Sequence, residues 1–196
     1  MSDLDLTLAR PALDMSPVPG LGADITALPN RGMITLRGDL ADAGFAAALQ
    51  AATGCAVPDV RGSTSAGDNR ALWMSPDEVM VFCDWSWAPG MVDTFMQKAG
   101  DAHVLALDVS DARAVLRVAG AKAWRVLAKG APVDLAPGRL SVGDIRRTRI
   151  ATVAVGIVKT EEDAFEVFCF RSYAEYLWTW LNTGAGAESL SDLQAT

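Results

Sequence analysis

Hydrophobic residues recur along the chain either at the spacing of a β-strand or at the spacing of an α-helix. The order of the strands and helices that they predict is similar in the two halves of the chain. In the first half, apolar β-branched runs predict strands at 24–28, 33–37, 70–74 and 78–83. The last two form a hairpin across Ser75-Pro76-Asp77, because proline favours a tight turn there. Apolar residues at helical spacing predict helices at 40–52 and 89–99, the first capped by Asp39 and ended by Gly54. Between that helix and the hairpin, the polar residues 58–69 predict a loop.

The second half gives the same order of elements. It predicts strands at 103–107 and 114–118, a helix at 121–128, apolar strand runs at 148–158 and 164–170, and a last helix at 172–182. Gly38 and Gly120 mark the same strand-to-helix step in the two halves. We therefore predict an α/β fold of the α+β kind: two similar strand-strand-helix-hairpin-helix units, about 23–100 and 101–183, packed as one duplicated domain.

Both ends of the chain lack a sustained period. Residues 1–22 are rich in proline and glycine and predict an extended arm, either disordered or lying across a neighbour. The arm's apolar residues (Leu4, Leu6, Leu8, Leu13 and Val18) favour the second alternative. Residues 184–196 are small and polar, and they predict a frayed tail.

Composition narrows the function classes. The net charge of −7 argues against a nucleic-acid partner, which would call for a basic face. The longest apolar run, 150–158, is far shorter than the roughly 20 residues that span a bilayer, and the acidic start is unlike a signal peptide, so we expect a cytoplasmic protein without a membrane partner. An apolar content of 51% indicates either surface that a permanent partner covers or simply an alanine-rich chain.

Searches for catalytic, cofactor-binding and metal-binding residues identify none. One histidine and three widely spaced cysteines offer no zinc pattern, and we read Cys55, Cys83 and Cys169 as reduced, buried side chains. The glycine-rich stretch 62–67 is followed by Asp68 and Asn69, where a phosphate loop needs lysine and a hydroxyl residue.

Two groups of residues are candidates for a partner interface. Arg146, Arg147 and Arg149 form a tight basic cluster that either docks an acidic surface or is an ordinary solvated strand. The tryptophans Trp85, Trp87 and Trp178 are candidate anchors, and core packing is the alternative for each. Trp178 lies off the apolar stripe of its helix, so we expect it to be the most exposed of the three.

Four segments resemble the gamma subunit of heterotetrameric sarcosine oxidase: 70–82 (RALWMSPDEVMVF), 107–135, 146–155 (RRTRIATVAV) and 163–181 (DAFEVFCFRSYAEYLWTWL). The resemblance covers about 24–181, and the Asp-Val-Ser-Asp-Ala-Arg and Arg-Ser-Tyr-Ala-Glu-Tyr-Leu-Trp stretches are its most specific parts. It implies a fold akin to part of the folate-binding glycine-cleavage T-protein, an aminomethyltransferase.

The resemblance also implies a function for the whole complex. That enzyme demethylates sarcosine to glycine, passes electrons to oxygen to form hydrogen peroxide, and transfers the one-carbon unit to tetrahydrofolate. The resemblance places FAD, FMN, NAD, tetrahydrofolate and zinc on the alpha, beta and delta subunits and none on this chain, which contacts mainly alpha. We therefore expect a non-catalytic structural subunit, with a free-standing folate-binding aminomethyltransferase and a homo-oligomeric binding module as alternatives.

Overall fold

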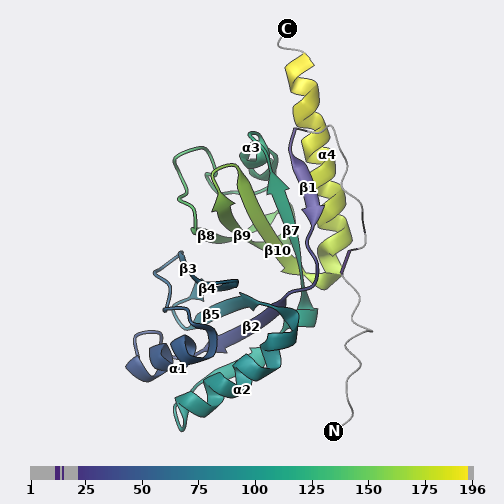
Figure 1. Cartoon of the computed structure of the whole chain (residues 1–196). Helices are drawn as coiled ribbons and strands as arrows, with labels where there is room; N and C mark the ends of the chain where they lie inside the picture. The colour runs from purple at the N-terminus through teal and green to yellow at the C-terminus, as the bar shows by residue number, and fades with distance from the viewer. Residues whose placement is uncertain (1–11, 14, 16–21, 194–196) are drawn as a thin grey trace.

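The computed structural model describes residues 12–13, 15 and 22–193, so most of the predicted arm lies outside the described residues. Two five-stranded sheets face each other, and helices cover their outer faces (Figure 1). The predicted α+β fold is thereby confirmed. No helix of the described part is long and apolar enough to cross a membrane.

The first sheet has the strand order β3-β4-β5-β2-β6 and carries two helices. Its strands are β2 (Gly32–Arg37), β3 (Ser63–Ala66), β4 (Asn69–Ser75), β5 (Glu78–Cys83) and β6 (Leu105–Asp108). The helices α1 (Ala43–Thr53) and α2 (Ala88–Ala99) pack on its outer face, and the short helical turn η2 (Trp85–Trp87) leads from β5 into α2.

The second sheet has the order β1-β7-β10-β9-β8 and the same plan. Its strands are β1 (Asp24–Ala27), β7 (Arg113–Ala119), β8 (Ile145–Ile150), β9 (Val153–Glu161) and β10 (Ala164–Phe170). The helices α3 (Ala123–Ala128) and α4 (Ala174–Leu193) cover it, and two more short turns, η3 (Ser110–Ala112) and η4 (Arg171–Tyr173), precede β7 and α4.

The two halves exchange their first strands. Strand β1 belongs to the first half but pairs with β7 in the second sheet, and β6 belongs to the second half but pairs with β2 in the first sheet. Both pairings are antiparallel and place the exchanged strand at the edge of the other half's sheet. Each half therefore completes the sheet of the other.

Strand registers reveal a repeat at the level of single residues. Gly32 lies opposite Cys83 between β2 and β5, and Ala114 lies opposite Cys169 at the corresponding place between β7 and β10. The segments Val81-Phe82-Cys83 and Val167-Phe168-Cys169 are therefore structural equivalents. Aligning the halves on this shared Val-Phe-Cys would have shown the duplication in the sequence.

Three apolar clusters hold these layers together. Two lie between a sheet and its own helices, and the third lies between the two sheets. At the centre of the third, the rings of Phe82 and Phe168 meet edge to face with centroids 5.4 Å apart. Because these rings are equivalent residues of the two halves, they lie at the approximate twofold axis that relates the units.

Three sequence predictions in the first helix, the polar loop and the long apolar run need correction. The first helix is capped by Asp42, whose carboxylate accepts from the Phe45 amide at 2.8 Å, and Asp39 instead closes the preceding turn. The predicted loop 58–69 contains the edge strand β3, which pairs with β4. The predicted run 148–158 is two strands, β8 and β9, that reverse at Ala151, a residue with a φ of 51°.

The last helix also extends beyond its predicted end. The sequence placed this end at 182 with a frayed tail after it, whereas α4 continues to Leu193. Ala185 is fully buried in the second sheet's core cluster, and its carbonyl accepts from the Gly22 amide at 3.1 Å. Gly184 lies close to Val126 and Trp180. Tertiary packing thus stabilises a segment whose own composition is a weak helix former.

We predict that Gly156→Ala destabilises the fold. A Cβ atom there would overlap the ring of Phe168. Overpacking of this kind should lower the free energy of unfolding by about 2–3 kcal/mol, measured by urea denaturation. The matched control is Gly90→Ala on α2, where nothing lies within 4 Å, and its stability should be unchanged or slightly raised. Equal stability of the two variants would contradict the packing assigned to Phe168.

Candidate functional site

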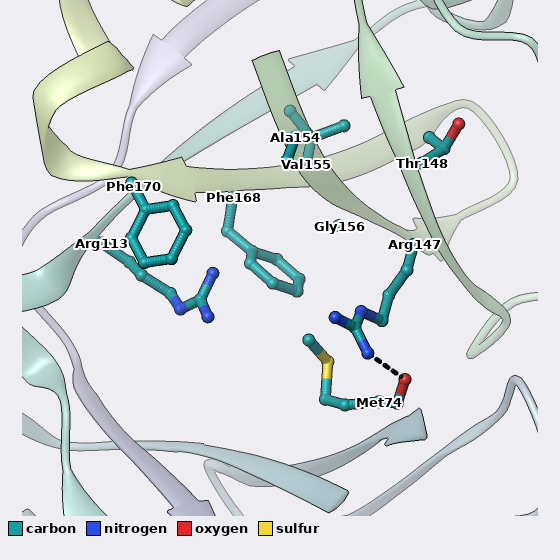
Figure 2. Close-up of a pocket in the computed structure, with 9 residues that line it drawn as sticks. All are labelled: Met74, Arg113, Arg147, Thr148, Ala154, Val155, Gly156, Phe168 and Phe170. Carbon is teal, nitrogen blue, oxygen red and sulfur yellow. Dashed lines mark hydrogen bonds between the residues drawn. The ribbon is translucent and has the colours of Figure 1, made fainter. Parts of the chain in front are cut away.

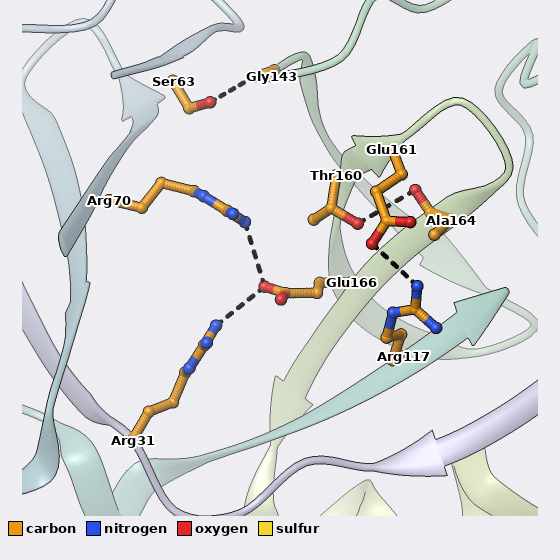
Figure 3. Close-up of polar contacts among 9 residues, drawn as sticks. All are labelled: Arg31, Ser63, Arg70, Arg117, Gly143, Thr160, Glu161, Ala164 and Glu166. Atoms are coloured by element: carbon orange, nitrogen blue, oxygen red, sulfur yellow. Dashed lines mark hydrogen bonds and ion pairs between the residues drawn. The ribbon is translucent and has the colours of Figure 1, made fainter. Parts of the chain in front are cut away.

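The facing surfaces of the two sheets carry different chemistry on the two sides of the Phe82–Phe168 pair. On one side, Glu166 of β10 crosses to the first sheet and pairs with Arg31 at 3.0 Å and Arg70 at 3.3 Å (Figure 3). The Glu166 side chain is only 10% exposed. One buried carboxylate is therefore shared by two guanidinium groups, and the three residues fill this side of the space between the sheets.

The equivalent residues on the other side leave a cavity. Arg70 lies opposite Phe82, whereas Gly156 lies opposite Phe168, so glycine takes the place of the arginine. Met80 lies opposite Thr35, whereas Glu166 lies opposite Arg117, so methionine takes the place of the carboxylate. A cavity of about 350 Å³ opens here beside Gly156 and Phe168 (Figure 2).

Arg113, the equivalent of Arg31, lines this cavity. Its guanidinium carbon lies 4.7 Å from the ring centre of Phe170 and 5.8 Å from that of Phe168. Its Nε atom is buried and has no hydrogen-bond partner among the described residues. Burial lowers the pKa of Arg113, the Glu78 carboxylate opposes this shift, and the charge of Arg147 adds to it.

Arg147 brings a second charge to the same cavity. One of its Nη atoms donates to the carbonyl of Met74 on the first sheet at 2.8 Å, so it also bridges the two sheets. Both guanidinium groups point toward the space beside Phe168 (Figure 2). The geometry is suited to binding an anion, and the Thr148 hydroxyl is the one uncharged polar side chain among its lining residues.

The three arginines predicted as an interface divide between the two faces of β8. Arg147 lies in the cavity between the sheets, and Arg149 follows on the same face by the strand's alternation. Arg146 lies on the opposite face, where it pairs with Asp144 at 3.5 Å and donates to the carbonyl of Ile145. The sequence could not separate the three because a cluster of like residues says nothing about register.

Trp85 and Trp87 lie elsewhere, on η2 at the end of β5. Trp87 is 53% exposed, and Trp85 is half-buried and lines a separate hollow of about 580 Å³ with Pro89 and η3. No cavity or contact found among the described residues includes both these tryptophans and the β8 arginines. The structure therefore places the predicted interface residues in two surface regions.

The exposure expected of Trp178 is wrong. Its side chain is 3% exposed and belongs to the core cluster between the second sheet and α4. The helix is covered on a wider arc than the predicted stripe because it packs against both β1 and β7. Tyr173 and Tyr176, at the start of the same segment, are the residues exposed to solvent instead.

The cysteines and the histidine of the described part form no reactive cluster. Burial raises the pKa of Cys83 and of Cys169 to about 11, which keeps both thiols protonated and poorly nucleophilic. No group of three potential metal ligands occurs among the residues that the structure describes. The single histidine, His103, is exposed in the turn before β6.

Comparison with known families and proteins gives consistent matches. The model of the sarcosine oxidase gamma subunit family matches residues 37–188. The gamma subunit of sarcosine oxidase from Corynebacterium sp. strain U-96 is 33% identical over 138 residues, which cover 69% of this chain. The aligned part spans 66% of the length of that relative, a little under two thirds.

Solved structures agree with this match. A chain of the heterotetrameric sarcosine oxidase from Corynebacterium sp. U-96, solved in complex with pyrrole 2-carboxylate, superposes with a TM-score of 0.80 at 28% identity, covering 88% of this chain and 89% of that chain. The glycine cleavage system aminomethyltransferase T from Bartonella henselae superposes with a TM-score of 0.61 at 15% identity, covering 82% of this chain and 45% of the other. The second match shows a shared fold, as the resemblance implied.

We predict that Trp178→Ala acts on folding. Truncating this buried ring should lower the free energy of unfolding by about 3–5 kcal/mol in urea denaturation. Trp87→Ala is the matched control, and its stability should stay within about 0.5 kcal/mol of the unmodified chain because the ring is largely exposed. A Trp178→Ala variant of normal stability would show that the ring is not part of the core.

The buried thiols predict a fall in stability at alkaline pH. The pKa of Cys169 is raised from 9.0 to about 11, so between these values the unfolded chain loses this proton before the folded chain does. The free energy of unfolding should therefore fall as the pH rises from 9 toward 11. Urea denaturation across this range should show a shallower fall for Cys169→Ala. Parallel curves for the two chains would rule out a buried, protonated thiol.

Proposed function

The chain belongs to the sarcosine oxidase gamma subunit family, and on this premise we propose that it is a non-catalytic structural subunit of a heterotetrameric sarcosine oxidase. The observation that carries the proposal is the superposition, over most of both chains, on a chain of a heterotetrameric sarcosine oxidase. In such an assembly this chain would brace larger subunits that contain the reaction centres.

Exposed aromatic residues support a role in assembly. Trp87 lies on η2, and Phe170 and Tyr173 lie where β10 runs into η4, each about half exposed. Aromatic and arginine side chains are the types most enriched where protein partners meet. We propose that Trp85, Trp87 and the β8 arginines (Arg146, Arg147 and Arg149) contribute to partner contacts, and we withdraw Trp178 because its side chain is buried.

The reaction proposed for the whole complex takes place on its other subunits. It is the oxidative demethylation of sarcosine to glycine, with formation of hydrogen peroxide and transfer of the one-carbon unit to tetrahydrofolate. We propose that FAD, FMN, NAD, tetrahydrofolate and zinc are bound by the alpha, beta and delta subunits, and that this chain contacts mainly alpha. Its own contribution would be to hold the assembly together, as one duplicated domain.

The second candidate function is a free-standing, folate-binding aminomethyltransferase. Its support is the fold shared with aminomethyltransferase T, of which this chain covers 45%. Likeness of fold alone is a weak argument for activity, because one fold serves many functions. Titration of the full chain with tetrahydrofolate tests this candidate directly, and saturable binding would favour it.

Co-purification tests the proposed function. We expect a tagged chain, isolated from its native host, to bring a flavin-coloured complex with larger subunits and sarcosine-dependent peroxide formation. Removing this chain should lower both the recovery and the activity of the complex. The full chain expressed alone should be prone to aggregation, because surface that the partner covers would be exposed. A colourless, single-species preparation would contradict the proposal.

Substituting the exposed Trp87 tests whether η2 contacts the partner. Trp87→Ala should leave the unfolding of this chain unchanged and weaken its binding to the complex by about 2 kcal/mol, the usual size for an interface anchor. The dissociation constant of the complex, measured by biolayer interferometry, reports this change. Unaltered affinity would remove η2 from the interface and leave the subunit assignment standing.

A further inference from the structure

The cavity lined by Arg113, Arg147, Ala154, Phe168 and Phe170, here called the arginine pocket, contains two guanidinium groups, and neither forms an ion pair with a residue that the structure describes. No aspartate or glutamate lines it. Glu78 acts on Arg113 through its charge but pairs directly with Arg37 at 2.8 Å, and Glu166 pairs with Arg31 and Arg70. The pocket is therefore electrostatically incomplete.

Few donors of the two guanidinium groups have a hydrogen-bond acceptor among the residues that the structure describes. A guanidinium group offers five N–H donors, and Arg147 directs one Nη atom to the Met74 carbonyl. Arg113 is held between aromatic rings, and its buried Nε–H has no acceptor in the described chain. Burying an unpaired donor costs free energy, as does placing two like charges in one cavity. An anion entering the pocket would relieve both.

The approximate twofold symmetry indicates which anion fits. At the equivalent place in the other half, Arg31 meets the carboxylate of Glu166, which is buried between the sheets. Arg113 occupies the place of Arg31, and Met80 occupies the place of Glu166. An arginine is thus present on both sides, whereas this chain supplies its carboxylate partner on one side only.

The rim of the pocket indicates where the missing carboxylate comes from. Phe170, which lines the pocket, is 49% exposed, and Tyr173 and Tyr176, which follow it in the sequence on η4 and α4, are 50% and 48% exposed. Exposed aromatic side chains and arginines are the residue types enriched at protein–protein contacts.

We propose that the arginine pocket is the docking site for an aspartate or glutamate side chain of the partner subunit, which would pair with Arg113 and Arg147. The inference rests on the proposed function, since it needs a partner subunit. It adds to the proposed function the chemical group that is bound, a carboxylate, and the residues that bind it, Arg113 and Arg147. Charge complementarity makes this partner surface acidic, although this chain itself has a net charge of −7.

The direct test replaces Arg113 in the assembled complex. Arg113→Met keeps the apolar stem and removes the charge, and we expect the dissociation constant to rise about 30-fold or more, the size expected on breaking a buried charge pair. The dissociation constant of Arg113→Lys should lie between those of the unmodified chain and Arg113→Met, because an ammonium group keeps the charge but cannot form a bidentate pair. The control is Arg139→Met, on an exposed loop pairing with Asp134, and its affinity should not change.

A second pair of variants leaves both arginines in place. Ala154 lines the pocket and lies opposite Arg149 across the β8–β9 ladder. Ala154→Glu would supply a carboxylate from this chain and repel the partner's carboxylate, whereas Ala154→Gln has the same size and no charge. We expect the glutamate variant to weaken the complex at least 10-fold more than the glutamine variant. Equal losses would show a purely steric contact and would overturn the proposal.

The remaining outcomes are also decisive. If the complex forms and Arg113→Met binds as tightly as the unmodified chain, the proposal is wrong and the subunit assignment stands. If, in addition, the full chain binds benzoate but not benzamide, and Arg113→Met abolishes that binding, the pocket takes a free carboxylate. If no complex can be isolated at all, the proposed function fails and the inference falls with it.

Discussion

The exchange of edge strands between the two halves is the constraint on which the rest of this structure depends. Without β1 from the first half, β7 would present an open edge, and β2 would do the same without β6. The exchange brings the connecting segments across the gap between the sheets, which places Arg31 and Arg113 at equivalent points beside the central phenylalanine pair. Both the inter-sheet ion pairs and the arginine pocket follow from that crossing.

The two halves offer equivalent positions for charged residues between the sheets, and different residues occupy them. One side is closed by the buried carboxylate of Glu166. The other side has Met80 and Gly156 at the positions equivalent to Glu166 and Arg70, and the ring of Phe168 lies against Gly156 there. The ion pairs of Glu166 stabilise the chain itself. On the other side, Arg113 is free of an ion pair within the described chain and can bind a carboxylate of a partner.

These features fit a subunit whose surface is specialised for assembly. The chain is acidic overall, but its arginine pocket is basic, and this separation of charge gives a partner's acidic group one defined place to dock. Burial raises the pKa of Cys83 and of Cys169 to about 11, so these two thiols are protonated and poorly nucleophilic. The family to which the chain belongs is named for one subunit of an enzyme, in agreement with this view.

The sequence by itself determined the helices, most of the strands, the plan of two similar units and the family, because periodicity and motifs are local properties of the chain. It could not determine which sheet β1 and β6 join, since strand pairing depends on contacts between distant residues. The same limit explains the buried Trp178 and the longer α4, where packing overrides a helix stripe and a weak propensity. Only the tertiary structure brought Arg113 and Arg147 into one pocket, because register and the approach of the two sheets decide which charges meet.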